Sequence, residues 1–385
     1  MAEDADAIDR AVRLHGQALA AVDEGRLDEA RLLALDALAL FERESGPGHP
    51  DLANVLNCLS TIDTHRAEYR DSESSARRAV EIMRQVRTQA DGPDIDRLYV
   101  QSLTALGNAL RVLGHYADAA PLLEEARAIA EKAFGEDDDV IAALNALGML
   151  CKYDGRFDQG AAYYARAIQV GERLHGPDDV SLASLLHNVG GLEHARGEYA
   201  KGEPAARRSV ELRERALGAD HPTVAADVAA LAALIDAQGR HDEAEQMYRR
   251  ALAVFERTFG PRHYEVAITL NNLAGVRDAL GHPDEAEVLY RRALAIKEAL
   301  LGGDHPDVAM TLNNLALLLA SSGRANAAEP LYQRALCTFT AALAPGHPKI
   351  QGCAANYAAL LRERGDEAAA RALESRHSPN RRHSR

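Results

Sequence analysis

A block of about 42 residues that recurs along the chain is the feature that most limits how it can fold. The two clearest copies begin at Leu270 and Leu312, and each has LNNLA followed by glycine, tyrosine and alanine at the same spacing. Stepping through the sequence with this period, with one longer step of 47 residues, locates nine anchors: Leu14, Leu56, Leu103, Leu144, Leu186, Val228, Leu270, Leu312 and Ala354. A period of this length predicts a repeat architecture instead of ordinary globular domains.

Each repeat has the pattern of two helices joined by a turn. Eleven residues after the anchor stands a glycine in eight of the nine repeats, and Ala67 takes this place in the second. Glycine ends helices because it accepts the left-handed conformation of a C-terminal cap. Apolar residues recur at three- and four-residue spacing before it, as in Leu312, Leu315 and Leu319, which is the stripe of an amphipathic helix. We therefore predict a first helix before each glycine and a second helix after it.

The composition agrees with an all-α chain. Hydrophobic residues make up 47% of the sequence but aromatic residues only 5%, and Ala and Leu, both strong helix formers, supply most of the apolar content. One helix pair buries too little surface to fold alone, so neighbouring pairs must stack on one another. The predicted fold is an α-solenoid of nine helix-turn-helix units with a concave and a convex wall.

The repeats resemble those of the tetratricopeptide family. The resemblance rests on the spacing of Leu270, Leu273, Ala274, Gly281, Ala286, Tyr290 and Ala293. The 42-residue period, the LNNLA block and the GxxHPxV turn resemble the kinesin light chain type in particular, although the heptad coiled coil that such a chain places before its repeats is missing. The resemblance implies a right-handed superhelix whose concave groove binds a peptide or a partner helix.

The repeats are expected to occupy residues 1–375, with the short last unit acting as a terminal cap. Residues 376–385 change to a basic sequence that contains Ser378 and Ser384, and they are expected to form a disordered tail. The longer step between Leu56 and Leu103 falls around residues 87–96, where we expect a surface loop.

Binding residues are expected on the first helices. Positions one, five and eight residues after each anchor flank the core-facing stripe and would point into the groove. The first of these positions holds Asn57, Asn145, His187, Asn271 and Asn313. The resemblance implies that asparagine here pairs with the backbone of a bound peptide, a role that suits a side chain with both a donor and an acceptor.

A basic patch is expected in the amino-terminal half of the groove. Eight residues after their anchors stand Arg111 and Lys152, whereas the sixth and seventh repeats carry Asp236 and Asp278 there. With Asn108, Asn145 and Tyr153 nearby, Arg111 and Lys152 predict a site for an acidic segment of a partner. The competing interpretation is that these are ordinary solvated positions.

Charge and cysteine content exclude several classes of function. The formal net charge is −14, which disfavours binding to nucleic acid or to an anionic membrane. The four cysteines show no CxxC spacing, and no apolar window is long enough for a membrane span. The amino terminus, MAEDADAIDR, is acidic and lacks the apolar core of a signal peptide. These features favour a cytoplasmic protein.

No catalytic or metal-binding motif stands out, and neither an enzyme activity, a metal nor a cofactor is expected. His49, His221, His305 and His347 all precede proline at one repeated place, which indicates a structural role. Three functions remain open: an adaptor that binds a protein or peptide partner, a sensor whose superhelix changes shape on binding, and a self-assembling structural element. Neither the partner nor the oligomeric state follows from the sequence.

Overall fold

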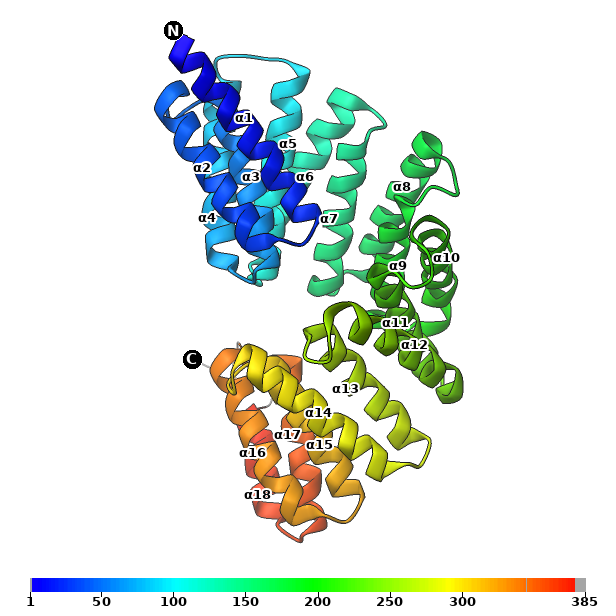
Figure 1. The fold of residues 1–385 in the computed structure, drawn as a ribbon. Coiled ribbons are helices and arrows are strands. Elements are labelled where there is room, and N and C mark those ends of the chain that lie inside the picture. Colours follow the sequence, from blue (N-terminus) through cyan, green and yellow to red (C-terminus); the bar gives the residue numbers. More distant parts are fainter. Residues whose placement is uncertain (1, 344, 378–385) are drawn as a thin grey trace. The chain divides into compact units, whose positions relative to one another are not determined.

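The computed structural model describes residues 2–343 and 345–377, and all regular elements in these ranges are α-helices (Figure 1). The eighteen helices confirm the predicted all-α repeat fold. They fall into two units, residues 1–198 and residues 199–385, which we describe separately.

Unit 1 holds the first nine helices. They are α1 (Ala2–Asp23), α2 (Leu27–Ser45), α3 (Pro50–His65), α4 (Tyr69–Arg87), α5 (Pro93–Val112), α6 (Tyr116–Phe134), α7 (Asp138–Asp154), α8 (Phe157–His175) and α9 (Leu182–Arg196). From α1 to α8, each odd-numbered helix packs against the even-numbered helix that follows it. The odd-numbered helices also contact one another in sequence, from α1 through to α9. These odd-numbered helices therefore form one continuous surface, which we call the first-helix surface of unit 1.

Unit 2 continues with the same alternation. Its helices are α10 (Tyr199–Leu217), α11 (Pro222–Asp236), α12 (His241–Phe259), α13 (Tyr264–Ala279), α14 (Pro283–Leu301), α15 (Pro306–Ser321), α16 (Ala325–Ala342), α17 (Pro348–Glu363) and α18 (Glu367–His377). Here α11 packs on α12, α13 on α14, α15 on α16 and α17 on α18. The helix α18 runs two residues into the expected tail, because it includes Arg376 and His377. The remainder of that tail, with Ser378 and Ser384, lies outside the described residues.

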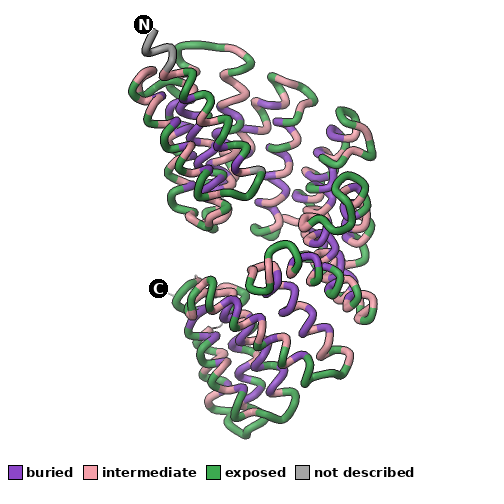
Figure 2. The backbone as a smooth tube through the Cα atoms, in the orientation of Figure 1, coloured by how far each residue is buried: buried purple, intermediate pink, exposed green. Residues whose placement is uncertain are grey.

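Small side chains let the paired helices approach closely. The residue that follows each turn by twelve positions is fully or almost fully buried: Ala37, Ala79, Ala126, Ala167, Ser209, Ala251, Ala293 and Ala335. Tyr164, Tyr248 and Tyr332 fill the space beside them and are at most 1% exposed. Figure 2 shows such buried residues spread along the helices of both units. The core is thus a series of small repeated contacts, as in other stacked-repeat proteins.

The repeated histidines cap the first helices. The Nδ1 atom of His305 accepts a hydrogen bond from the backbone N–H of Asp307 at 3.1 Å. His49, His221 and His347 accept the same hydrogen bond at the starts of other first helices. A side-chain acceptor at this position satisfies one of the unpaired N–H groups of a helix start. The structural interpretation of these histidines is confirmed. His263 is a fifth member, which lacks the following proline and was not expected.

The extra residues between the second and third repeats mostly lengthen a helix. The sequence predicted a surface loop around residues 87–96, but only residues 88–92 lie outside helices. Pro93 occupies the first turn of α5, and Asp94 and Asp96 follow it there. Both features favour a helix start, because proline loses no hydrogen bond in the first turn and carboxylates suit the positive end of the helix. An ion pair between Arg87 and Asp96 at 2.9 Å closes the short turn.

Candidate binding surface

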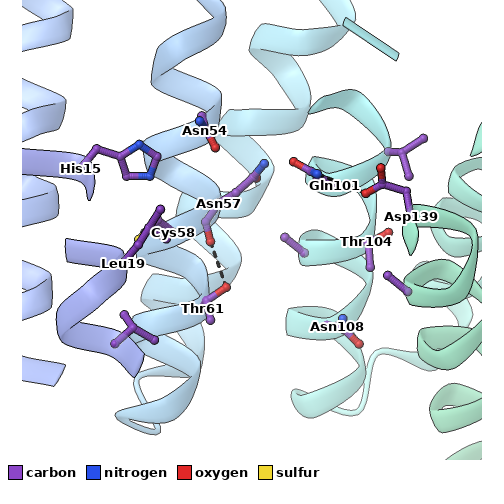
Figure 3. A pocket seen from close by; sticks show the side chains of 14 residues that line it. His15, Leu19, Asn54, Asn57, Cys58, Thr61, Gln101, Thr104, Asn108 and Asp139 are labelled. Atoms are coloured by element: carbon purple, nitrogen blue, oxygen red, sulfur yellow. Dashed lines mark hydrogen bonds between the residues drawn. The ribbon is translucent and has the colours of Figure 1, made fainter. Parts of the chain in front are cut away.

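A pocket of ≈330 Å³ lies on the first-helix surface of unit 1 (Figure 3). Side chains from α1, α3, α5 and α7 line it: His15, Leu19, Val22, Asn54, Asn57, Cys58, Thr61, Val100, Gln101, Thr104, Ala105, Asn108, Asp139 and Ala142. Among the expected site residues, Asn57 and Asn108 are therefore in one pocket. Gln101 and Asp139 were not expected, although Gln101 lies one helical turn before Thr104 and so shares its face.

Four polar side chains of this pocket have an atom without a hydrogen-bond partner in the described chain. These buried atoms are His15 Nε2, Asn57 Oδ1, Thr104 Oγ1 and Asn108 Oδ1. A buried polar group without a partner costs about 1–3 kcal/mol, so native proteins rarely keep several together unless water or a ligand completes them. Their grouping in one pocket marks this part of the first-helix surface as a place where a polar ligand can bind.

The orientation of Asn57 follows from its neighbours. Ser102 Oγ donates to the backbone oxygen of Leu98 at 2.8 Å, so it accepts from Asn57 Nδ2, at 3.0 Å. The amide nitrogen of Asn57 is thereby occupied, and Oδ1 remains as an acceptor in the pocket. Thr61 lies one turn further along α3 and donates to the backbone oxygen of Asn57 at 3.2 Å (Figure 3). Asn57 therefore offers an acceptor to a ligand N–H.

His15 contributes a neutral ring at neutral pH. Burial lowers the pKa of His15 because it penalises the charged imidazolium, and the charge of Asp51 opposes this only in part. A neutral imidazole has one donor and one acceptor nitrogen. The pocket is thus lined by uncharged hydrogen-bonding groups on α1, α3 and α5, and its one carboxylate belongs to Asp139, which accepts from Gln101 Nε2 at 3.1 Å.

Arg111, Lys152 and Tyr153 form a cluster further along the same surface. The Arg111 Cζ atom lies 5.3 Å from the centre of the Tyr153 ring, and Lys152 Nζ lies 5.7 Å from it. Both cations therefore share one aromatic ring, which favours them by cation–π attraction. Burial lowers the pKa of Arg111, and the pKa of Lys152 is lowered by burial and also by the charge of Arg111. We call these three residues the cationic cluster.

The cationic cluster differs from the ion-paired basic residues on the second helices of unit 1, such as Arg127 and Arg78. Arg127 is paired with Glu124 at 2.9 Å and with Glu131 at 2.5 Å, and Arg78 is paired with Glu42. Across residues 2–343 and 345–377, neither Arg111 nor Lys152 forms an ion pair, and Arg111 Nε is buried without a hydrogen-bond partner. The sequence placed Arg111, Lys152 and Tyr153 together, and the structure brings them into contact.

The asparagines outside this region are engaged within the protein. Asn145 Oδ1 accepts from Asn188 Nδ2 at 2.9 Å. In unit 2, Asn271 Oδ1 accepts from Asn314 at 3.4 Å and Asn313 Oδ1 accepts from Asn356 at 3.2 Å. These side-chain oxygens connect neighbouring first helices, and the Nδ2 atoms of Asn271 and Asn313 also donate within the chain, to Asn272 and Asn314. His187 is half-buried on α9, in the same row as Asn145.

Two first helices of unit 2, α11 and α13, carry carboxylates where α5 and α7 carry cations. Asp236 Oδ1 lies 2.7 Å from the Nδ1 atom of His241, so its carboxylate has a local hydrogen-bond partner. Burial raises the pKa of Asp278. These two helices thus carry the opposite charge to α5 and α7 at the equivalent position, as the sequence indicated, whereas α17 of unit 2 carries Arg362 there.

Within the described chain, no group of three or more His, Cys, Asp or Glu side chains is arranged to hold a metal ion. Cys58, Cys151 and Cys353 are buried free thiols, and burial raises the pKa of each. The helices of the described residues include none with the length and apolarity needed to cross a bilayer.

Models of the tetratricopeptide repeat match most of the chain. One matches residues 9–85, 98–159, 139–200, 225–299 and 284–341, and a second matches residues 182–223. No protein of curated function matches the chain in sequence.

Several solved structures have a similar fold. A Rap protein complexed with Competence and Sporulation Factor is 13% identical, with 85% of this chain and 97% of that chain covered and a TM-score of 0.58. The apo form of the quorum sensor NprR from B. thuringiensis is 12% identical, with 87% and 98% covered and a TM-score of 0.53. TPR-like repeats named after a kinesin light chain of Podospora anserina are 21% identical, with 51% and 93% covered and a TM-score of 0.43.

Proposed function

Because this chain belongs to the tetratricopeptide repeat family, we propose that it is a non-enzymatic scaffold that binds a segment of a partner protein on the first-helix surface of unit 1. The observation that carries the proposal is the group of unpartnered polar atoms on His15, Asn57, Thr104 and Asn108 in one pocket. A bound backbone would supply both the N–H donors and the C=O acceptors that these atoms lack.

The cationic cluster sets the proposed chemistry of the partner. Arg111 and Lys152 are partly buried and have no carboxylate partner in the described chain, so an acidic residue of the bound segment would recover the interaction that they lack. Such a contact contributes to affinity and to the choice of partner, because the charges are desolvated. The partner segment would therefore place polar backbone at the pocket and an acidic group at Arg111 and Lys152.

A cytoplasmic location is part of this proposal. Cys337 is an exposed free thiol, and the three other cysteines are buried and unpaired. Free thiols of this kind persist in reducing compartments, whereas oxidising compartments favour disulfides.

A sensor is the second candidate, and the fold of two neighbours favours it. The Rap structure contains a bound factor and NprR is named a quorum sensor, although identities of 13% and 12% support only the likeness of fold. A sensor would change its dimensions when a ligand binds. Small-angle X-ray scattering with and without a short peptide copy of the partner segment separates the two, since a rigid scaffold then keeps its radius of gyration and a sensor does not.

The scaffold proposal is tested by capture with charge-reversed variants. Wild type, Arg111→Glu/Lys152→Glu and a control, Arg70→Glu/Lys132→Glu, are used to capture proteins from the native cell extract. The control residues are exposed on α4 and α6, and they undergo the same change of charge. We expect wild type and control to retain a partner that the Arg111/Lys152 variant loses, with binding weakened by roughly 1 kcal/mol or more.

Binding of the captured partner at the pocket is then tested with the variant Asn57→Ala/Asn108→Ala. These substitutions remove two pocket acceptors without changing charge. Retention of the partner by both the charge-reversed and the alanine variants would contradict the proposed surface. If the purified chain instead gains mass with concentration and captures nothing, self-assembly is the better account.

A further inference from the structure

Arg111 and Lys152 bring two positive charges to one aromatic ring without a counter-ion from the described chain. Arg111 projects from the last turn of α5 and Lys152 from the last turn of α7, and both lie over Tyr153. Helix ends favour cations, which explains one charge on each helix. It does not explain why the two side chains converge on the same ring, where each disfavours the charge of the other.

The groups around the pair add no compensating negative charge. Asp154 is the nearby acid on α7, and its carboxylate is bound to Arg156 Nε at 2.7 Å. Tyr116 on α6 and Tyr164 on α8 are phenols, and burial raises the pKa of both, so they stay neutral at neutral pH. His194 on α9 lies close enough to Lys152 that the lysine charge, together with burial, lowers the pKa of His194. The surroundings of the cluster are therefore neutral or positive.

A ligand with two negative charges suits such a pair better than a ligand with one. A carboxylate would neutralise one cation and leave the other without a partner. A phosphate monoester carries a charge of about −1.5 to −2 at pH 7 and three strong acceptor oxygens, which match the donors of a guanidinium and an ammonium. We infer that Arg111 and Lys152, backed by Tyr153, form a subsite for a phosphate monoester on the partner segment. This inference rests on the proposed function and specifies its acidic group.

Gly191 shapes the proposed subsite from α9. A Cβ atom at Gly191 would lie 2.9 Å from Lys152 Nζ, so the absence of a side chain makes room for the ammonium group. Gly191→Ala would displace Lys152 Nζ without changing any charge. Because Nζ ends a flexible side chain, the substitution should leave the fold intact.

The subsite can be tested on the purified full chain with small anions. Methyl phosphate, sulfate and acetate are titrated at constant ionic strength into protein labelled with ¹⁵N-arginine, and the Arg111 Nε–H signal is followed by NMR. Arg111→Lys identifies that signal. We expect methyl phosphate and sulfate to bind at least tenfold more tightly than acetate, because both can carry two charges. Equal affinity for acetate and methyl phosphate, or no saturation with any anion, would overturn the inference.

The pH dependence of anion affinity distinguishes titration of the ligand from titration of the protein. The second ionisation of a phosphate monoester falls near pH ~6, whereas sulfate keeps two charges throughout. The ratio of methyl phosphate to sulfate affinity should rise between pH 5 and 8, and titration of His194 cancels in that ratio.

Lys152→Gln and Gly191→Ala should each weaken the binding of both anions several-fold. Arg70→Gln/Lys132→Gln should leave them unchanged, and an equal loss in this control would show nonspecific screening and contradict a subsite.

The source of the phosphate is tested with the captured partner. Treatment of the partner with a protein phosphatase should abolish its retention by wild type if the segment is phosphorylated. Retention that survives dephosphorylation overturns the inference even if free methyl phosphate binds. The scaffold proposal stands in that case, provided that Arg111→Glu/Lys152→Glu still loses the partner, so the two failures can be told apart.

Discussion

Lys297 Nζ donates a hydrogen bond to Thr311 Oγ1 at 3.0 Å inside the core of unit 2, where Lys297 is 4% exposed. The 42-residue period places Phe255 and Phe339 at the same position in the neighbouring repeats. Two repeats earlier the position holds Arg213, which is paired with the buried carboxylate of Asp227 at 2.6 Å. Lys297 has no such pair within the described residues, and its other contact is the backbone oxygen of Asp307 at 3.4 Å.

Replacing this lysine should stabilise the protein. Burial of an ammonium without a carboxylate is unfavourable, so Lys297→Met, which keeps the length and removes the charge, should raise the free energy of unfolding of unit 2 by about 1–3 kcal/mol at pH 7. Urea unfolding followed by circular dichroism measures the change. Arg213→Met is the contrasting variant: it leaves Asp227 buried without its cation and should destabilise by about 3–5 kcal/mol. Destabilisation by Lys297→Met would contradict our reading of this contact.

The same contact predicts a pH dependence. Burial lowers the pKa of Lys297, so the unfolded chain binds the proton more tightly than the folded chain. Stability should therefore rise with pH between the lowered folded pKa and the unfolded value of about 10.4. The advantage of Lys297→Met over wild type should shrink between pH 7 and pH 10 in urea unfolding. An advantage that stays constant from pH 7 to pH 10 would mean that the pKa of Lys297 is not lowered in the folded chain, and it would contradict the prediction.

The histidine caps predict local loss of structure in acid. His347 Nδ1 accepts from the Lys349 N–H at 3.1 Å, and burial, with the charge of Lys349, lowers the pKa of His347. Protonation of Nδ1 removes the acceptor, so the contribution of the cap is present above pH ~6.5 and is lost as pH falls below it. The protection factor of the Lys349 amide in hydrogen exchange, which corrects for the pH dependence of the intrinsic rate, should therefore fall in that range. His347→Asn should remove this pH dependence, whereas His347→Ala should lose about 1 kcal/mol of local stability at neutral pH.

Ala67 is the one non-glycine residue with positive φ in the described chain, at 60°. It stands where the other repeats have their turn glycine, and an L-residue in this conformation is strained. Ala67→Gly should therefore stabilise unit 1 by about 0.5–1 kcal/mol, as measured by thermal unfolding. Gly155 has φ 76° at the equivalent turn, so Gly155→Ala should destabilise by a similar amount. Destabilisation by Ala67→Gly, or stabilisation by Gly155→Ala, would contradict the assignment of strain.

Gly148 is needed for the packing of α7 against α8. A Cβ atom there would lie 2.6 Å from the Tyr164 ring, which is fully buried. Gly148→Ala should destabilise unit 1 by about 1–3 kcal/mol through overpacking. Gly16 on α1 is the matched control, because a Cβ atom there meets nothing within 4 Å. Gly16→Ala should stabilise by about 0.5–1 kcal/mol, since alanine is the better helix former, and thermal unfolding of both variants checks the contrast.

The candidate site was only partly predictable from the sequence. The helical period placed Asn57, Asn108 and Arg111 on one face of first helices, because side-chain direction along a helix is a local property. The period could not show that Asn145 would be occupied by Asn188, a residue of the next repeat. It also gave no sign that Asp139 would join the pocket, since Asp139 reaches it from α7 of the next repeat.

The 42-residue pattern by itself determined the helices, their glycine ends and their histidine caps, since these depend on backbone conformation and on hydrogen bonds between residues a few positions apart. Tertiary packing alone decided which polar atoms lack partners. Whether His15, Thr104 or Lys297 finds a hydrogen-bond partner depends on side chains that the neighbouring repeat supplies. Burial then sets the free-energy cost of each polar group that lacks a partner.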